Sequence, residues 1–168
     1  MPYTVINLGG IVIGCAILIG FGIRWWFREG HDASALIPFV LAHLYGMIAA
    51  LATYTAWSLL GMVTWAAIWA GNAAGYAGLV WGVGGTDRNI TRATPVVLTE
   101  GGFVIVFLLT VVFLALWLWA RKIPRGKLAA GAVSGALLAL SGTVAGIAAI
   151  PLGSAVNGAG AVFTAYMQ

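Results

Sequence analysis

The chain has 168 residues, of which 62% are hydrophobic and only 7% are charged, and its mean hydropathy is +1.03. A soluble domain carries roughly 25% charged residues, so this composition argues against a soluble enzyme and indicates an integral membrane protein. The charged residues fall in three short clusters, which leave charge-free runs at 1–23, 33–86, 101–120 and 128–168. Each run reaches the length of about 20 apolar residues that a membrane-crossing helix needs.

The predicted fold is all-α: one membrane domain over 1–168, a helix bundle with about five transmembrane spans and glycine-rich packing faces. The first span is predicted at 5–27, because it ends in tryptophans and arginines that are typical of a membrane–water interface. A single helix over the uncharged run 35–84 would be about 75 Å long, more than twice the hydrocarbon thickness. This run is therefore predicted to cross twice, at 35–57 and 61–84.

A polar loop rich in turn residues follows at 84–95. The last two spans are predicted at 99–120 and 128–150. Pro151 is expected to break or kink the fifth span, because proline cannot supply a backbone donor inside a helix. The remaining stretch, 152–168, is expected to be a kinked continuation or a tail that lies on the membrane surface.

Half of the eight basic residues lie in one short loop: Arg121, Lys122, Arg125 and Lys127. Cations of this kind mark the cytoplasmic side of a membrane protein. They are also expected to bind anionic lipid headgroups.

A faint internal repeat relates two segments at a constant offset of 92 residues: Gly9–Ile13 with Trp25, and Gly101–Ile105 with Trp117. Transporters use such repeats, but apolar sequence of low complexity also produces them by chance, and chance is the favoured interpretation. If both tryptophan-rich ends face the cytoplasm, an odd number of crossings must separate them. The two crossings predicted for 35–84 conflict with this, so the orientation stays open.

Two predicted spans carry glycines at helical spacing: Gly71, Gly75, Gly78 and Gly82 in the third, and Gly131, Gly135, Gly142 and Gly146 in the fifth. Small residues let helix backbones approach closely, which is what holds helices together in a bilayer. These faces are predicted to be the main helix-packing sites. They can pack within one chain or between copies of it, and the fourth span, bulky on all sides, is expected to face lipid.

Two polar residues inside the predicted spans are candidates for a polar lining. His43 lies in the second span and Asn72 beside the glycine face of the third. Intramembrane polar groups can line a pore or relay protons, but they also form ordinary hydrogen bonds between helices. No catalytic residue, metal site or cofactor is predicted, because no metal-ligand spacing and no phosphate-binding loop occurs.

Residues 99–150 resemble the hairpin of type IV secretion pilins: an apolar helix, a basic loop from Arg121 to Lys127, and a helix of small residues. As a whole, with segments such as 32–39 and 128–135, the chain is similar to small membrane proteins of actinobacterial mobile elements, including plasmid spread proteins and phage membrane proteins. The resemblance implies a bacterial cell membrane and a role in DNA transfer or membrane passage.

The predicted function is a non-enzymatic, self-associating integral membrane protein that forms or supports a multi-subunit assembly, such as a channel or pore. An accessory subunit of a larger membrane complex and a holin-like permeabilising protein are the alternatives. The expected partners are membrane lipid, including anionic headgroups, and further copies of the chain or other membrane subunits. Direct contact with nucleic acid is left open.

Overall fold

A computed structural model of the chain describes residues 6–54, 58–90, 96–120, 123–139 and 149–167. Six α-helices make up most of this part: α1 (Leu8–Arg28), α2 (Ala33–Leu51), α3 (Leu59–Tyr76), α4 (Glu100–Trp119), α5 (Arg125–Ala139) and α7 (Ala149–Met167). A 3₁₀ turn, η1 (Ala52–Tyr54), follows α2, and a π-helical turn, η2 (Ala77–Gly82), extends α3. The all-α class predicted from the sequence is confirmed.

The number of predicted spans is wrong. Among the described residues, three helices are long and apolar enough to cross a membrane, α1, α2 and α4, and five were expected. The predicted third span corresponds to α3 and η2, and α3 contains three glycines, two tryptophans and Asn72. The predicted fifth span, 128–150, corresponds to α5 up to Ala139 and the first residues of α7, and residues 140–148 between them lie outside the described part.

Polar side chains determine where the helices start, and a prediction from long apolar runs does not take them into account. The caps Asn7, Asp32, Ser58 and Thr99 each accept a hydrogen bond from a backbone N–H of the first turn that follows. Such N-caps satisfy donors that have no partner inside the helix. Pro151 lies in the first turn of α7, where proline costs no hydrogen bond, and residues 140–148 before this helix are outside the described part.

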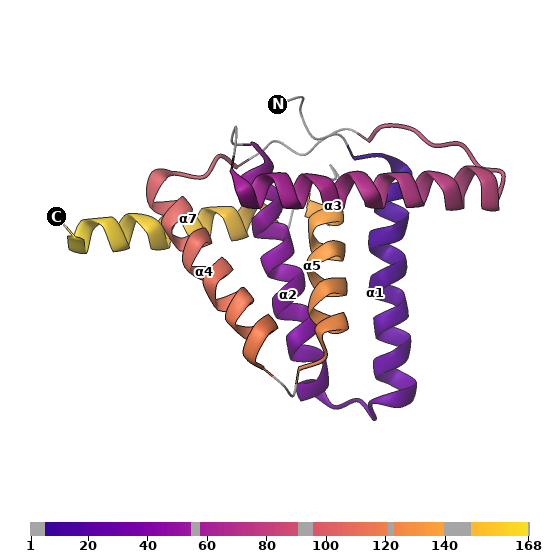
Figure 1. Cartoon of the computed structure of the whole chain (residues 1–168), viewed down its shortest axis with the longest axis horizontal. Coiled ribbons are helices and arrows are strands. Elements are labelled where there is room, and N and C mark those ends of the chain that lie inside the picture. Colours follow the sequence, from indigo (N-terminus) through magenta and orange to yellow (C-terminus); the bar gives the residue numbers. More distant parts are fainter. Residues whose placement is uncertain (1–5, 55–57, 91–95, 121–122, 140–148, 168) are drawn as a thin grey trace.

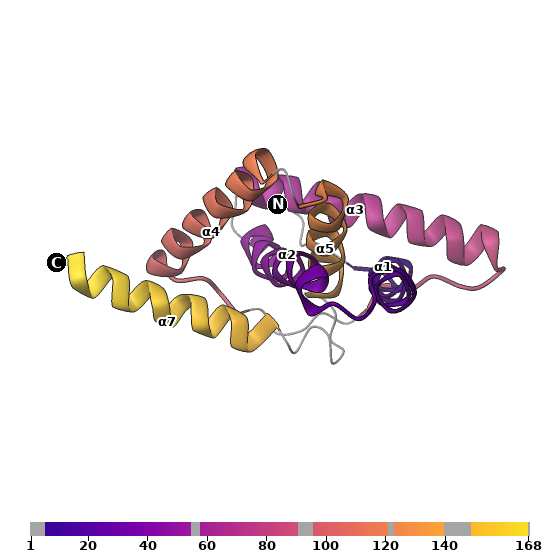
Figure 2. The same ribbon diagram turned by 90° about the horizontal axis from the view of Figure 1, so that it is seen from below.

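The helices form two groups with different directions (Figures 1 and 2). Helices α1, α2 and α5 lie side by side and nearly parallel in their axes, and α4 leans away from them. Helices α3 and α7 lie across this group at one end, here called the crosswise end. The links from α1 to α2 and from α4 to α5 lie at the other end, here called the basic end. The tail after Pro151 is thus a helix that crosses the group.

This arrangement repeats within the chain. Helices α1, α2 and α3 form one unit, and α4, α5 and α7 form a second with the same order: one helix toward the basic end, one back, and one crosswise (Figure 1). The cap of α1, Asn7, and the cap of α4, Thr99, are 92 residues apart, which is the offset seen in the sequence. The two crosswise helices extend in opposite directions. The match therefore reflects equivalent places in the fold, and the interpretation as chance is wrong.

The repeat also bears on the number of helices between the two tryptophan-rich ends. One helix, α2, separates the basic end of α1 from the crosswise helix α3. Both tryptophan-rich helix ends consequently lie at the basic end. Of the five basic residues in the described part of the chain, four belong to this end: Arg24, Arg28, Arg125 and Lys127.

The centre of the molecule is the contact between α2 and α5, one helix from each unit. A Cβ on Gly46 would overlap the backbone of Ala132, and a Cβ on Gly135 would overlap the carbonyl of His43. Larger side chains fill the core around this contact, among them Met47, Ile68 and Leu137. Close backbone approach at small residues thus holds the two units together.

Candidate functional site

The first polar cluster joins α3 to the start of α1. The amide of Asn72 accepts from the backbone N–H of Asn7 (3.3 Å), and the Asn7 side chain donates to the Asn72 carbonyl (3.3 Å). The carboxylate of Asp87 accepts from the Asn7 side chain (2.6 Å) and from the N–H of Gly9 (3.1 Å). A negative charge is favourable at a helix N-terminus. Asn72, expected as a candidate polar lining, is placed in this joint between helices.

An equivalent cluster joins α7 to the start of α4. The Asn157 side chain accepts from the backbone N–H of Thr99 (2.9 Å) and donates to the carbonyl of Val97 (3.0 Å). Sequence reasoning missed Asn157. The signal that could have found it is the pattern Asn-x-x-Gly, present at Asn72–Gly75 and again at 157–160.

His43 lies on α2 in contact with α5. Its Nδ1 is 2.7 Å from the hydroxyl of Ser134, which also donates to the carbonyl of Gly131 (3.0 Å). A serine hydroxyl has one proton, so when Ser134 donates to Gly131 the imidazole Nδ1 must carry the hydrogen. The His43 side chain is thereby occupied by a hydrogen bond between helices.

The predicted packing glycines have different places. Gly71 lies against Leu137, and Gly75 lies against the backbone of Gly9 on α1. Gly131 and Gly135 both lie against the backbone of α2, and the contact of Gly135 is the one described above. All four of these contacts are within one chain.

Gly78 and Gly82 lie in the π-helical turn η2, which contacts α1 far less than α3 does. No described atom lies within 4 Å of a Cβ placed on either of them. The wider turn also breaks the register that would align these glycines with Gly71 and Gly75. Gly142 and Gly146 are outside the described residues.

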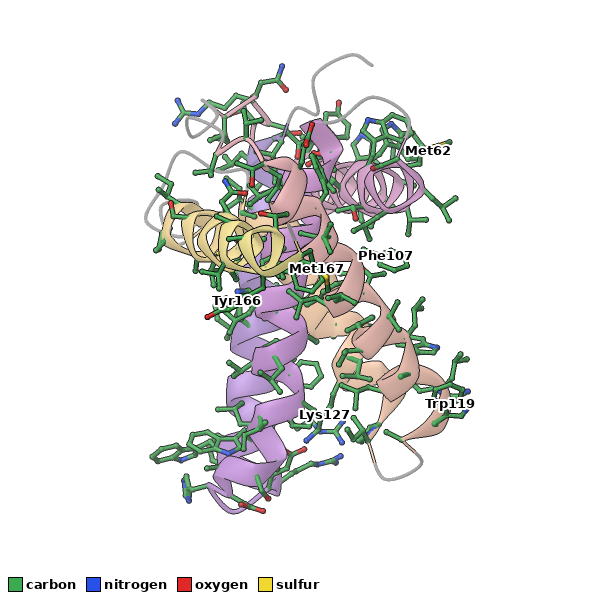
Figure 3. All side chains as sticks on the ribbon, turned by 90° about the vertical axis from the view of Figure 1, so that its left-hand side faces the viewer. Met62, Phe107, Trp119, Lys127, Tyr166 and Met167 are labelled. Carbon is green, nitrogen blue, oxygen red and sulfur yellow. The ribbon has the colours of Figure 1, made fainter. Side chains whose placement is uncertain are left out.

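The basic end is held by an internal ion pair. The ammonium of Lys127 donates to Glu29 (2.7 Å) and to the carbonyl of Ala35 (2.8 Å), and its side chain is 9% exposed. This tie joins the α1–α2 link to the start of α5. Figure 3 shows Lys127 at this end, beside α2. Lys127 was expected to bind headgroups, but its charge is already matched within the chain.

The other cations expected to bind headgroups are Arg121, Lys122 and Arg125. Arg125 is exposed at the start of α5, and its Nε donates to the carbonyl of Trp117 at the end of α4 (3.2 Å). Arg121 and Lys122 are outside the described residues. Among the described residues, no carboxylate pairs with Arg125.

The tie at the basic end predicts a pH dependence. The hydrogen bond from Lys127 and a weaker one from Arg24 hold the pKa of Glu29 below its ordinary value of 4.5. A carboxyl whose pKa is lowered by folding stabilises the fold above that value and loses its contribution as pH falls through the lowered pKa. We expect Glu29→Gln to flatten the fall in melting temperature between pH 5 and pH 3, measured in detergent. Asp32, whose pKa is also lowered, stays in both proteins, so parallel curves would contradict the prediction.

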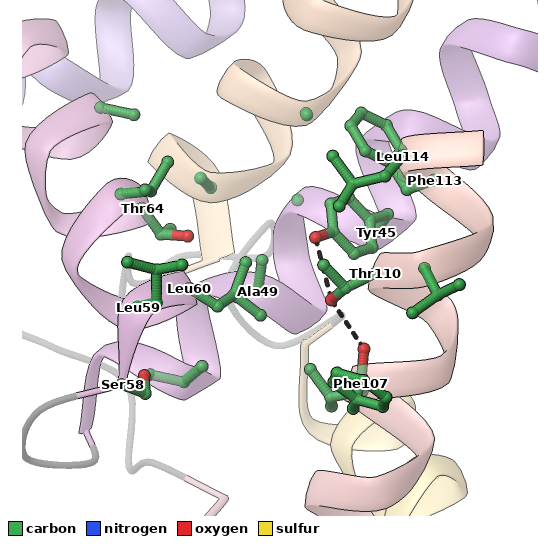
Figure 4. A pocket seen from close by; sticks show the side chains of 18 of the residues that line it. Tyr45, Ala49, Ser58, Leu59, Leu60, Thr64, Phe107, Thr110, Phe113 and Leu114 are labelled. Atoms are coloured by element: carbon green, nitrogen blue, oxygen red, sulfur yellow. Dashed lines mark hydrogen bonds between the residues drawn. The ribbon is translucent and has the colours of Figure 1, made fainter. Parts of the chain in front are cut away.

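An apolar groove lies between α4 and the rest of the molecule (Figure 4). Its volume is about 680 Å³. Phe107, Thr110 and Trp117 on α4 form one wall, and small residues of α5 such as Ala132 form the opposite wall. Tyr45 of α2 lies between them, and its hydroxyl donates to Thr110 (3.1 Å), as the dashed line in Figure 4 marks.

The described residues offer no group of three metal-ligating side chains. The described part of the chain contains polar joints between helices, a small-residue contact between the repeated units and an apolar groove. It is an all-α protein with three candidate membrane-spanning helices, which suggests a membrane location. No family model, curated protein or solved structure matches the chain.

Proposed function

We propose that the protein is a non-enzymatic subunit of a multi-subunit membrane assembly that forms by self-association. In this proposal the free end of α3 in one copy contacts the free end of α7 in the next copy. The observation that carries the proposal is that both crosswise helices extend past the bundle, in opposite directions and at the same end (Figures 1 and 2).

The two free ends are apolar. The α3 arm, residues 77–83, carries Trp81 and Val83, the latter 80% exposed. The α7 arm, residues 161–167, carries Tyr166 and Met167, the latter 73% exposed, and Figure 3 labels both at its tip. Large apolar side chains exposed together at a helix end are typical of a protein contact.

The positions of the arms determine what kind of assembly they support. Because the arms are on opposite sides and differ in sequence, a contact between an α3 arm and an α7 arm uses two different surfaces. Such a heterologous contact leaves one arm free on each copy and therefore continues, either to a closed ring or to a row. This supports an assembly of several copies over a simple pair. Its use in DNA transfer or membrane passage stays a prediction.

The proposal is tested by cross-linking between copies in the membrane. One tagged copy carries Val83→Cys, a second carries Met167→Cys, and both carry Cys15→Ser to remove the native cysteine. We expect a short bifunctional thiol reagent to join the two tagged copies when they are expressed together, because the proposed contact brings the arms within reach.

Two matched pairs serve as controls. Copies that both carry Val83→Cys should not cross-link, because like arms do not meet in a heterologous contact. Phe27→Cys, equally exposed but at the basic end, should not cross-link to Met167→Cys. Cross-linking of all pairs to the same extent, or of none, would contradict the proposal. Cross-linking solely to other proteins would favour an accessory subunit.

A further inference from the structure

We infer that the groove that α4 forms with α2, α5 and the first half of α3 binds one acyl chain of an anionic phospholipid, with the phosphate held at Arg125. This inference does not depend on the proposed assembly. It concerns the surface along α4, whereas the assembly uses the ends of α3 and α7.

The groove accepts an apolar occupant. Its lining is almost wholly carbon, and the two hydroxyl groups between α2 and α4 are already paired: Tyr45 donates to Thr110, and Thr110 donates to the carbonyl of Val106 (2.7 Å). A polar solute would lose its hydration here without gaining hydrogen bonds, which is costly. A hydrocarbon chain has no hydrogen bonds to water and therefore does not pay this cost.

The groove has the direction and length of a lipid chain. On α4 its lining runs from Phe103 to Trp117. These fourteen residue steps span about 21 Å along a helix axis, compared with about 15 Å for the hydrocarbon of one leaflet. Because α4 is a candidate membrane-spanning helix, a chain lying along it has the direction of the surrounding lipid chains.

A positive charge lies at one end of the groove. Trp117 lines that end, and its carbonyl accepts the hydrogen bond from Arg125, which places the Arg125 side chain at the mouth. Arg125 also begins α5, whose first turn contains no acidic residue. A helix N-terminus favours an anion, and a guanidinium makes strong hydrogen bonds to phosphate. The neighbouring Lys127 is neutralised by Glu29 and does not compete.

The comparison of the two repeated units explains why the groove is open. In the first unit, α1 packs along α5. Its equivalent, α4, leans away from α2 and is held mainly by α7 at the crosswise end (Figure 1). At membrane depth the space that this lean opens is reached first by lipid, which is what surrounds it.

The test uses the full-length protein in mild detergent and two probes with the same acyl chains, phosphatidylglycerol and phosphatidylcholine. Native mass spectrometry counts the lipid that each protein retains. We expect phosphatidylglycerol to be retained about tenfold more tightly than phosphatidylcholine, and Arg125→Gln to remove this preference, since one charge-assisted contact has about that effect.

Two neighbouring valines give a matched pair for the groove itself. Val111 lines the groove and is 48% exposed, whereas Val112 is 55% exposed and does not line it. Val111→Trp should reduce retention of both lipids, and Val112→Trp should leave it unchanged. Equal retention by the two variants would overturn the inference. If the protein forms a dimer that Val111→Trp abolishes and Val112→Trp does not, the groove binds a second copy of the chain. That result would also overturn the inference.

Discussion

A cysteine at Thr86 should react with an impermeant thiol reagent added to intact cells, and cysteines at Ala33 and Gly126 should not. Residues 33 and 126 both lie at the basic end, and residue 86 follows α3 at the crosswise end. The basic end carries four of the five described cations, so it should face the cytoplasm. The effect should be close to all-or-none. All variants carry Cys15→Ser.

Five spans would give a different labelling pattern. With two crossings between 35 and 84, residues 33 and 86 would lie on the same side and residue 126 on the other. Labelling of Ala33→Cys together with Thr86→Cys would therefore contradict the arrangement described here. Permeabilised cells supply the control, because all three cysteines are exposed and should react once the reagent can enter.

Replacing Gly75 with leucine should strongly destabilise the chain itself. A Cβ at this position would overlap the backbone of Gly9, so α1 and α3 would have to separate. The hydrogen bonds between Asn7 and Asn72 would be strained at the same time. Overpacking at a site without room costs about 3 kcal/mol or more, which corresponds to a fall in melting temperature of about 6–12 °C for a chain of this size.

Ala73→Leu is the matched control, because Ala73 is exposed and two residues away on the same helix. It adds a similar side chain and should leave the melting temperature within about 2 °C of the unchanged protein, as is usual for surface substitutions. The measurement is thermal unfolding in detergent. Equal losses in the two variants would mean that α3 and α1 are not in backbone contact.

Much of the local structure could be predicted from the sequence. Low charge and long apolar runs indicate membrane helices, and α1 and α4 lie close to their predicted bounds. Tryptophans beside arginines marked the ends of both helices, because such side chains prefer an interface. The periodic glycines pointed to α3 and α5, where Gly75 and Gly135 meet backbone of another helix.

The repeat was harder to recognise, for a reason that concerns spacing. The starts of α1 and α4 are offset by 92 residues, but Asn72 and Asn157 are offset by 85. A comparison at constant offset therefore loses the second half of the pattern. What the units share is a geometry, in which an asparagine of a crosswise helix bonds to the start of a membrane helix.

The sequence by itself determined that this protein is helical and suited to a membrane, because those properties depend on composition and local periodicity. The direction of α3 and α7 was decided by the tertiary structure. A helix of about 18 residues is long enough either to cross a bilayer or to lie across its neighbours. Helices α3 and α7 have that length but are less apolar than the three candidate spans. For α3, long-range contacts from Gly75 to Gly9 and from Asn72 to Asn7 fix the direction. Tertiary structure likewise decided that Lys127, which was expected to be a surface cation, pairs with Glu29 within the chain.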